Sequence, residues 1–383
     1  MEHHIVIIGC GPRGTYCFRR LALQLREKPL RNTVHIHVVE KSGKFGGGGV
    51  HSVSQPHWLL LNTVASQITA FGDDDREARA SEARRTLHGF LMERGFDFGP
   101  NDYPPRALHG EYLANAFDWT EANLPSGVFL HRRSAEAVDI LEPAGNIQQV
   151  ILKDGDTIPA NEIILVTGHA KNRVVPGSME DACLEFARSQ NEKGVDLSYT
   201  HSPYPITEKL ERIPAGDSVY VIGMGLTAID VIKGFTYGRG GSFKNGAYLP
   251  TGKEPRVILG SRTGLPFCAR GYNQKQAQYK GRFFTAEFIQ SLKKGGGKID
   301  FEADLLPTIR REMEYVFYST LMGESFGEQL SAFSSESERR SFVEKHVPFK
   351  QRYSWRDLEN PFWSLEDRRG PGEPLFESYE QYA

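Results

Sequence analysis

The chain has 383 residues, of which 39% are apolar, 25% are charged and 11% are aromatic. This composition is typical of a globular protein and excludes collagen-like repeats, a bare coiled coil and a largely disordered chain. With 46 basic and 48 acidic residues the net charge is −2, so neither nucleic acid nor an anionic membrane is an expected partner.

Membrane, disulfide and metal signals are all weak in this sequence. No apolar run approaches the ~18 residues of a membrane span, and the apolar part of the N-terminus is too short for a signal peptide. The four cysteines form no Cys-x-x-Cys pair, and the 12 histidines show no metal-ligand spacing. We therefore expect no metal and no disulfide framework, and we predict a reducing cytoplasm as the location.

The first motif is a glycine-rich turn between an apolar strand and a helix. An apolar run at 5–8 leads into Gly-Cys-Gly-Pro-Arg-Gly at 9–14, and a helical segment follows. A second apolar strand at 34–39 then ends at Glu40. The order of strand, Gly-x-Gly-x-x-Gly turn, helix, strand and acid predicts a dinucleotide site, although a turn that merely packs is the alternative.

Each residue of this motif has a physical task in nucleotide binding. Gly9 permits the tight turn, Gly11 lets the backbone approach a pyrophosphate, and Gly14 lets the helix pack closely on the strand. The helix start offers free N–H groups and a positive dipole end to the phosphates. Glu40 stands where a carboxylate would accept hydrogen bonds from ribose hydroxyls.

A second copy of the turn follows roughly 210 residues later. A strand at 219–222 precedes Gly-Met-Gly-Leu-Thr-Ala at 223–228, and the next strand at 256–260 ends at Ser261 and Arg262. No acid stands after this strand, and a guanidinium matches the oxygens of a ribose 2′-phosphate. The second site is therefore predicted to prefer NADPH over NADH, with a salt bridge of Arg262 to a carboxylate as the alternative.

Between the two turns, an apolar strand at 162–166 ends in Thr167 and Gly168, where the chain would leave an FAD domain. Two Rossmann-type turns with this strand between them are typical of flavoproteins that bind two nucleotides. FAD is then expected at the first turn and NADPH at the second, so that a hydride passes from nicotinamide to flavin.

Three further segments are candidates for flavin contact. Four glycines at 46–49 allow a backbone to lie against a flat ring, but they equally permit a flexible loop. Asn62 and Gln67 lie in a mostly apolar stretch, and amides suit the pyrimidine edge of a flavin, or else they satisfy backbone groups. Arg106 opens a predicted helix and is expected to face an anionic group.

Taken together, these stretches resemble the FAD/NAD(P)-binding protein family related to flavin-dependent N-hydroxylating monooxygenases, in its amino-acid N-hydroxylase branch. The resemblance covers roughly residues 1–275, and its matching stretches are 7–14, 61–67, 103–107, 223–230 and 261–266. It implies a flavin that is reduced by NADPH and forms a C4a-hydroperoxyflavin with dioxygen. Oxygen would then pass to the nitrogen of a small amine or amino acid.

Two other functions stay open. One is an NADPH-dependent flavin reductase or oxidase without oxygenase activity, and the other is a catalytically inactive nucleotide-binding regulatory protein. No residue can be named as catalytic. Substrate carboxylates would require cations, and Arg270 and Lys275 are the candidates, although a surface salt bridge is the simpler role for either. A homo-oligomer is also left open.

The predicted fold is α/β, with two Rossmann-type dinucleotide-binding domains and a helical C-terminal region. The expected bounds are 1–200 for the FAD domain, 201–280 for the NADP domain and 281–383 for the helical region. After residue 275 we find no closing strand over the flavin, so either the chain is a fragment of a longer protein or that part is absent.

The residues predicted to bind the two cofactors lie in or beside these turns and strand ends. They are Gly9, Gly11, Pro12, Arg13, Gly14, Glu40, Lys41, Gly47, Asn62, Gln67, Arg106, Thr167, Gly168, Gly223, Gly225, Leu226, Thr227, Ser261 and Arg262.

Overall fold

The structure is a computed structural model whose chain divides into two compact units, Met1–Gln274 and Lys275–Ala383. The residues that it describes are 2–27, 32–72, 86–142, 145, 147–169, 173–262, 264–266 and 279–352. Within the described residues, no helix is both long and apolar enough to span a membrane.

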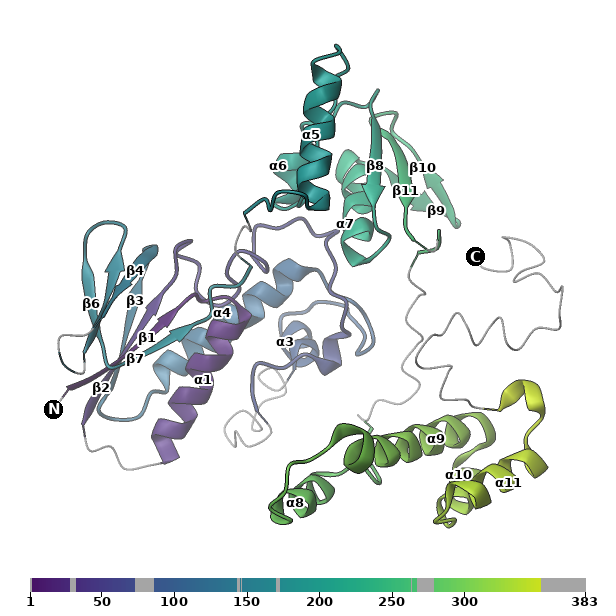
Figure 1. Ribbon diagram of the computed structural model, residues 1–383. Helices are drawn as coiled ribbons and strands as arrows, with labels where there is room; N and C mark the ends of the chain where they lie inside the picture. The colour runs from purple at the N-terminus through teal and green to yellow at the C-terminus, as the bar shows by residue number, and fades with distance from the viewer. Residues whose placement is uncertain are drawn as a thin grey trace. The chain divides into compact units, whose positions relative to one another are not determined.

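The first unit begins with a four-stranded parallel sheet in the order β3-β2-β1-β7 (Figure 1). Its strands are β1 (Glu2–Ile8), β2 (Thr33–Val39), β3 (Val128–Arg133) and β7 (Glu162–Leu165). The two central strands are almost wholly apolar near their carboxyl ends, as expected for parallel strands covered on both faces. The predicted strands at 5–8, 34–39 and 162–166 are all present, as β1, β2 and β7. The largest difference is that β1 already begins at Glu2.

Helices cover one face of this sheet (Figure 1). Helix α1 (Pro12–Glu27) contributes Phe18 and helix α4 (Arg106–Ala122) contributes Phe117, whose ring centroids lie 4.8 Å apart. Both rings are fully buried against Ile7 of β1 and Ile36 of β2. The short η1 turn (Ala65–Gln67) and helix α3 (Leu87–Glu93) pack in a neighbouring cluster with Tyr112 and Leu113 of α4.

The opposite face of the sheet carries a small antiparallel sheet in the order β4-β5-β6. Its strands are β4 (Ala137–Leu141), β5 (Gln148–Leu152) and β6 (Thr157–Ala160). Val6 of β1 and Val39 of β2 form a buried cluster with Val150 and Ile158 from these strands. The turn at the carboxyl ends of β1 and β2 is thus held by packing on both sides.

Four histidines stack on this second face of the four-stranded sheet. His4, His35, His37 and His131 come from β1, β2 and β3, and the strand registers pair His4 with His35 and His37 with His131. The rings of His37 and His131 are stacked with centroids 4.5 Å apart, and His4 Nδ1 lies 3.2 Å from His37 Nε2. No group of histidine, cysteine or acidic side chains in the described residues could hold a metal ion.

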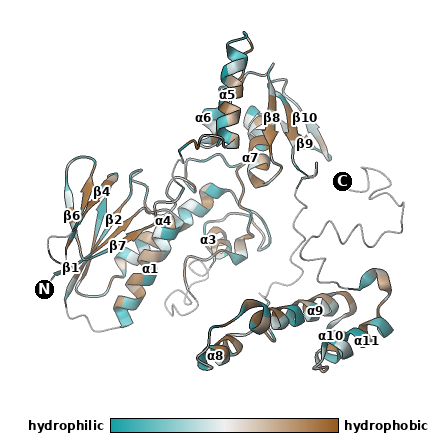
Figure 2. Ribbon diagram, in the orientation of Figure 1, coloured by the Kyte–Doolittle hydropathy of each residue, from teal (hydrophilic) through white to brown (hydrophobic). Residues whose placement is uncertain are grey.

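The same unit contains a second strand–turn–helix–strand element. Strand β8 (Ser218–Ile222), helix α7 (Leu226–Phe235) and strand β11 (Arg256–Gly260) follow one another, and the two strands pair in parallel. Both strands are largely brown in Figure 2, which marks apolar residues. Around them lie α5 (Met179–Asn191), α6 (Ile206–Leu210), η3 (Tyr237–Arg239), β9 (Ser242–Lys244) and β10 (Ala247–Leu249).

The second unit is helical throughout its described residues. It comprises α8 (Ala286–Lys294), the π-helical turn η4 (Phe301–Leu305), α9 (Leu306–Met322), α10 (Glu324–Ser331), α11 (Glu336–His346) and η5 (Phe349–Gln351). Its core gathers Tyr318, Leu330, Val343 and Val347.

One buried carboxylate fixes the start of this helical unit. Glu312 of α9 accepts hydrogen bonds from the backbone N–H groups of Arg282, Phe283 and Phe284, at 2.6 to 2.9 Å. The hydroxyl of Tyr279 donates to the same carboxylate. Four donors around one acidic group satisfy it well, and they lower the pKa of Glu312 against the opposing effect of burial.

Candidate functional site

The first glycine turn has the geometry predicted for it. Gly9 has a φ of +104°, and its N–H donates to the Val39 carbonyl at the end of β2, at 2.8 Å. A side chain at Gly14 would place its Cβ 2.1 Å from the Gly9 carbonyl, so only glycine lets α1 pack this closely. A Cβ at Gly11, by contrast, would have only the Gly47 carbonyl oxygen near it, at 4.0 Å. Open space therefore lies beside Gly11, where a pyrophosphate was predicted.

Glu40 helps to form this turn. One carboxylate oxygen accepts from the Cys10 N–H at 2.8 Å, and the other accepts from the N–H and hydroxyl of Ser42. Oε2 accepts only from Cys10 among these donors and keeps a second lone pair, so a ribose hydroxyl could still bind there. The predicted ribose contact stays a prediction, as does that of the exposed neighbour Lys41.

The glycine loop packs tightly at 46–48, between the turn and α4. Gly46 has a φ of +110°, and a Cβ there would lie 2.5 Å from the Ala114 nitrogen. A Cβ at Gly48 would lie 2.8 Å from the Gly11 Cα, so the loop touches the nucleotide turn itself. Gly46, Gly47 and Gly48 are all buried against protein backbone, which argues against a flexible loop at these positions, and the flavin contact of Gly47 stays a prediction.

Two histidines that sequence reasoning missed lie beside this loop. His109 of α4 is buried, and its Nδ1 lies 3.3 Å from His51 Nδ1, while its Nε2 has no hydrogen-bond partner. Burial, followed by the charge of His51, lowers the pKa of His109 to about 3, and burial, followed by the charge of Arg106, lowers the pKa of His51 to about 4. The pair is therefore neutral at physiological pH. No sequence signal marks it, because the two residues are joined only by the fold.

The predicted amide contacts are accessible. Asn62 and Gln67 both have exposed side chains, so neither is locked into the core, and a flavin edge could be met by either. Thr167 and Gly168 follow β7 and are also exposed, with Gly168 at a φ of +72°.

The second glycine turn repeats the geometry of the first. Gly223 has a φ of +98°, and its N–H donates to the Gly260 carbonyl at the end of β11, at 2.7 Å. Gly225 is the N-cap residue of α7, and Leu226 and Thr227 open the helix with exposed side chains. Space is open here too, since a Cβ at Gly223 would meet nothing within 4 Å.

The end of β11 presents the side chain predicted to select NADPH. Arg262 is exposed and forms no ion pair with any residue that the structure describes. Ser261 donates from its hydroxyl to the Leu265 carbonyl at 3.3 Å. A positive, solvent-facing guanidinium at this strand end is compatible with a ribose 2′-phosphate.

Arg106 contacts an anionic group, but that group is a side chain of the protein. Its Nη2 lies 2.7 Å from Asp230 Oδ2 on α7, and its Nε donates to the Leu60 carbonyl at 3.0 Å. Tyr204 donates to the same Asp230 oxygen. Asp230 was not singled out from the sequence, although an acid in a mostly apolar helix is a signal that could have indicated a buried partner.

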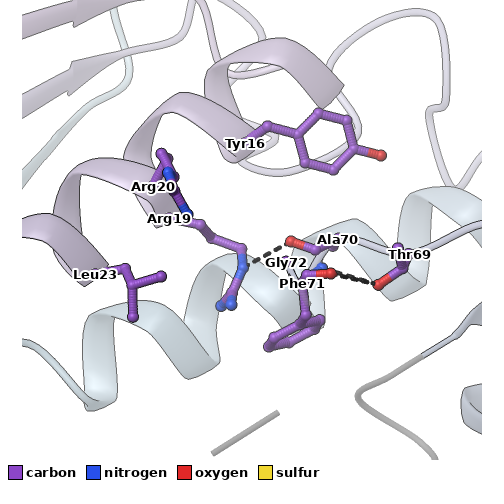
Figure 3. A pocket seen from close by; sticks show the side chains of 8 residues that line it. All are labelled: Tyr16, Arg19, Arg20, Leu23, Thr69, Ala70, Phe71 and Gly72. Carbon is purple, nitrogen blue, oxygen red and sulfur yellow. Dashed lines mark hydrogen bonds between the residues drawn. The ribbon is translucent and has the colours of Figure 1, made fainter. Parts of the chain in front are cut away.

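A cavity of about 450 Å³ runs along α1, lined by that helix and by the segment 69–72 (Figure 3). Arg19 stands in it with its guanidinium 3.5 Å from the Phe71 ring centroid. Its Nε donates to the Ala70 carbonyl at 2.8 Å, and its Nη1 donates to the Thr120 hydroxyl at 2.7 Å. This guanidinium holds the segment against α1, so the cavity is not assigned a ligand. The predicted substrate residues Arg270 and Lys275 lie outside the described residues.

Comparison with known proteins finds one matching family model and similar monooxygenases. Residues 6–170 match the family model described as FAD-NAD(P)-binding. An L-aspartate N-monooxygenase (nitrosuccinate-forming) from Streptomyces davaonensis is 32% identical over 95% of this chain and 62% of its own length. A nitrosuccinic acid synthase from Aspergillus oryzae is 30% identical over 94% of this chain and 57% of its own. The chain thus spans about three fifths of the length of these relatives.

Among solved structures, a flavin-containing monooxygenase from Stenotrophomonas maltophilia is 18% identical, with a TM-score of 0.37. The alignment covers 68% of this chain and 58% of that one. Residues 6–170 thus match an FAD-NAD(P)-binding family, and the predicted resemblance to amino-acid N-hydroxylating flavin monooxygenases is confirmed by these relatives.

Proposed function

We propose that this chain is an FAD- and NADPH-dependent monooxygenase that acts in the cytoplasm and hydroxylates the nitrogen of an amino acid. In this proposal two Rossmann-type domains, at 1–200 and 201–280, bind the two cofactors, and residues 281–383 form a helical region. The name of the Streptomyces davaonensis relative specifies L-aspartate, so an acidic amino acid is the first substrate to test. Dioxygen is the co-substrate.

The observation that carries the proposal is the repetition of one turn geometry within a single chain. Gly9 and Gly223 share a left-handed backbone and the same hydrogen bond to the end of the neighbouring strand. The family match covers the first turn, which supports FAD there. The exposed Arg262 beside the second turn supports NADPH there.

When bound, FAD would supply the redox chemistry, accepting a hydride from nicotinamide and activating dioxygen. The chain's own residues would bind and orient. Backbone N–H groups at the start of α1, around Arg13 and Gly14, would hold the FAD pyrophosphate, and Glu40 would hold its ribose. Asn62 and Gln67 would approach the flavin ring edge. At the second site the start of α7 would hold the NADPH pyrophosphate, and Arg262 with Ser261 would hold its 2′-phosphate.

The test is reconstitution of the purified chain with FAD, followed by a flavin spectrum and measurement of bound stoichiometry. NADPH oxidation is then measured with and without L-aspartate, L-glutamate, ornithine and lysine, and N-oxidised products are detected by mass spectrometry. We expect one FAD per chain and an N-oxidised product from an acidic amino acid.

Other outcomes support the alternatives. NADPH oxidation that ignores every amino acid and releases only hydrogen peroxide indicates a flavin reductase or oxidase. A chain that takes up neither FAD nor NADPH is a protein without this chemistry, and the proposal is then wrong.

A further inference from the structure

A largely buried ion pair joins α4 to α7, the helix that follows the second glycine turn. Arg106 opens α4 beside the first nucleotide-binding part, and Asp230 lies on α7, the helix of the second turn. The Nη2–Oδ2 distance is 2.7 Å, and Asp230 is only 4% exposed. Asp230 comes five residues after the N-cap Gly225, about 7–8 Å along the helix from its phosphate-binding end.

Arg106 also contacts the segment that carries Asn62. Its Nε donates to the Leu60 carbonyl at 3.0 Å, and its own N–H donates to the Leu59 carbonyl at 2.8 Å. Leu60 forms an isolated bridge with Pro105, the residue before the helix. A single side chain therefore connects the middle of α7 to a backbone position two residues from Asn62.

The same segment is anchored in the core of the second part. Leu59 is 1% exposed and packs with Val231 and Phe235 of α7. The Trp58 ring lies against the end of that helix, since a Cβ at Gly234 or Gly238 would come within 3.2–3.3 Å of it. The hydroxyl of Tyr204 completes the arrangement by donating to Asp230.

The apolar contacts of Trp58 and Leu59 already hold α7 to this segment. Burying an ion pair as well brings little net stability, because desolvation of the two charges offsets their attraction. The ion pair does fix the orientation of α7 relative to the segment 58–62. The planar guanidinium of Arg106 donates in fixed directions to Asp230 and to the Leu60 carbonyl at the same time. The apolar contacts therefore account for the stability of this arrangement, and the ion pair accounts for its orientation.

We propose that Arg106 and Asp230 are positioning residues for hydride transfer, which orient α7 and its nucleotide toward the segment 58–62 on the flavin side. The inference rests on the proposed function, and it adds that the angle between the two cofactors is set by this pair. Misplacement of reacting atoms by about 1 Å can cost as much as 100-fold in rate.

The test removes both charges together, in an Arg106→Met/Asp230→Leu double variant reconstituted with FAD. Replacing a buried pair by apolar residues leaves stability largely intact. We expect wild-type FAD content, a thermal midpoint near that of wild type, an NADPH Kd within about twofold and equal flavin reduction by dithionite. Anaerobic flavin reduction by saturating NADPH, followed by stopped flow, should slow by about 10- to 100-fold.

Asp230→Asn and Arg106→Lys are the second set of variants, because the double variant also changes the packing around the pair. Asp230→Asn keeps the side-chain shape, and Arg106→Lys keeps the charge but loses the planar donors; both should slow flavin reduction by NADPH without changing the dithionite reaction. The matched control is Glu208→Leu/Arg212→Met, which removes an exposed ion pair of the same 2.7 Å length at α6. The control should reduce flavin at the wild-type rate.

Two results would contradict this inference, and each differs from the result that would refute the proposed function. Wild-type rates of NADPH-driven reduction in the double variant and in Asp230→Asn overturn the positioning role. A fall in FAD content or thermal midpoint that accounts for the whole loss of rate also overturns it, in favour of a structural role. By contrast, a wild-type chain that binds no FAD refutes the proposed function itself and this inference with it.

Discussion

Gly9 and Gly223 adopt the same left-handed backbone, with φ values of +104° and +98°, and each donates its N–H to the carbonyl that ends the neighbouring strand. Their surroundings differ. A Cβ at Gly9 would lie 2.4 Å from the Val166 carbonyl oxygen, whereas one at Gly223 would meet nothing within 4 Å. The first turn is enclosed by its sheet, and the second stands at an open edge.

Gly11→Val should abolish FAD binding and leave the fold intact. The structure has room for the side chain, because a Cβ at this position is no closer than 4.0 Å to any neighbour, but that room is the space proposed for the pyrophosphate. Flavin stoichiometry after reconstitution measures the first effect, and circular dichroism with thermal melting measures the second.

Gly216→Val is the control for this variant, since Gly216 is an exposed loop glycine with open space around it. It should bind FAD as wild type does. A Gly11→Val protein with one FAD per chain would show that the pyrophosphate lies elsewhere.

Arg262→Ala should raise the KM for NADPH far more than that for NADH. Loss of a charge-assisted contact to the 2′-phosphate costs about 1–3 kcal/mol, which corresponds to roughly 5- to 150-fold. Steady-state oxidation of both nucleotides measures the ratio. Arg256→Ala, at the other end of β11, should leave the ratio unchanged, and an equal effect of Arg262→Ala on both nucleotides would remove the 2′-phosphate role.

Stability should fall as the pH falls from about 6.5 to about 4. Burial, and then the charges of neighbouring histidines and of Arg133, lower the pKa of His37 to about 4. Between that value and the ordinary histidine pKa of ~6.5, the unfolded chain binds a proton that the native protein does not. His51 and His109 act in the same direction. Urea unfolding midpoints at pH 7.5, 6.0 and 5.0 should decrease in that order.

His37→Asn should flatten this pH dependence, because it removes one of the groups that take up a proton on unfolding. The same substitution at the exposed His57 provides the control and should leave the slope unchanged. If His37→Asn keeps the full slope, the histidine stack does not contribute to acid sensitivity.

Cys10 should resist thiol reagents in the native protein. Its thiol is fully buried in the first turn, and burial raises its pKa to about 11, so almost no reactive thiolate is present at pH 8. Cys17 and Cys183 are only half-buried and should react earlier. Labelling with iodoacetamide, mapped by mass spectrometry with and without urea, gives the order, and early modification of Cys10 would show that the turn opens.

The local elements could be predicted because their signals are local. Strand periodicity and the two glycine patterns lie within short stretches of sequence, and each glycine of the first turn has the steric reason expected of it. Gly14 and Gly11 illustrate this well, one closed by the Gly9 carbonyl and the other open toward the expected ligand.

The long-range contacts could not be predicted in the same way. Arg106 was expected to face an anion, but no spacing rule connects it to Asp230 in a different nucleotide-binding part. Apolar residues alternate with His35 and His37, which indicates that both histidines lie on one face of a strand. Only the register between strands brings His4 and His131 onto that face.

The four hydrogen bonds that converge on Glu312 bear on where this polypeptide can be divided. A recombinant boundary placed before Tyr279 keeps all the donors of that carboxylate together with α9. A boundary placed after Phe284 would leave the buried carboxylate of Glu312 without those donors. The first choice is the one to make when the helical portion is expressed or fused separately.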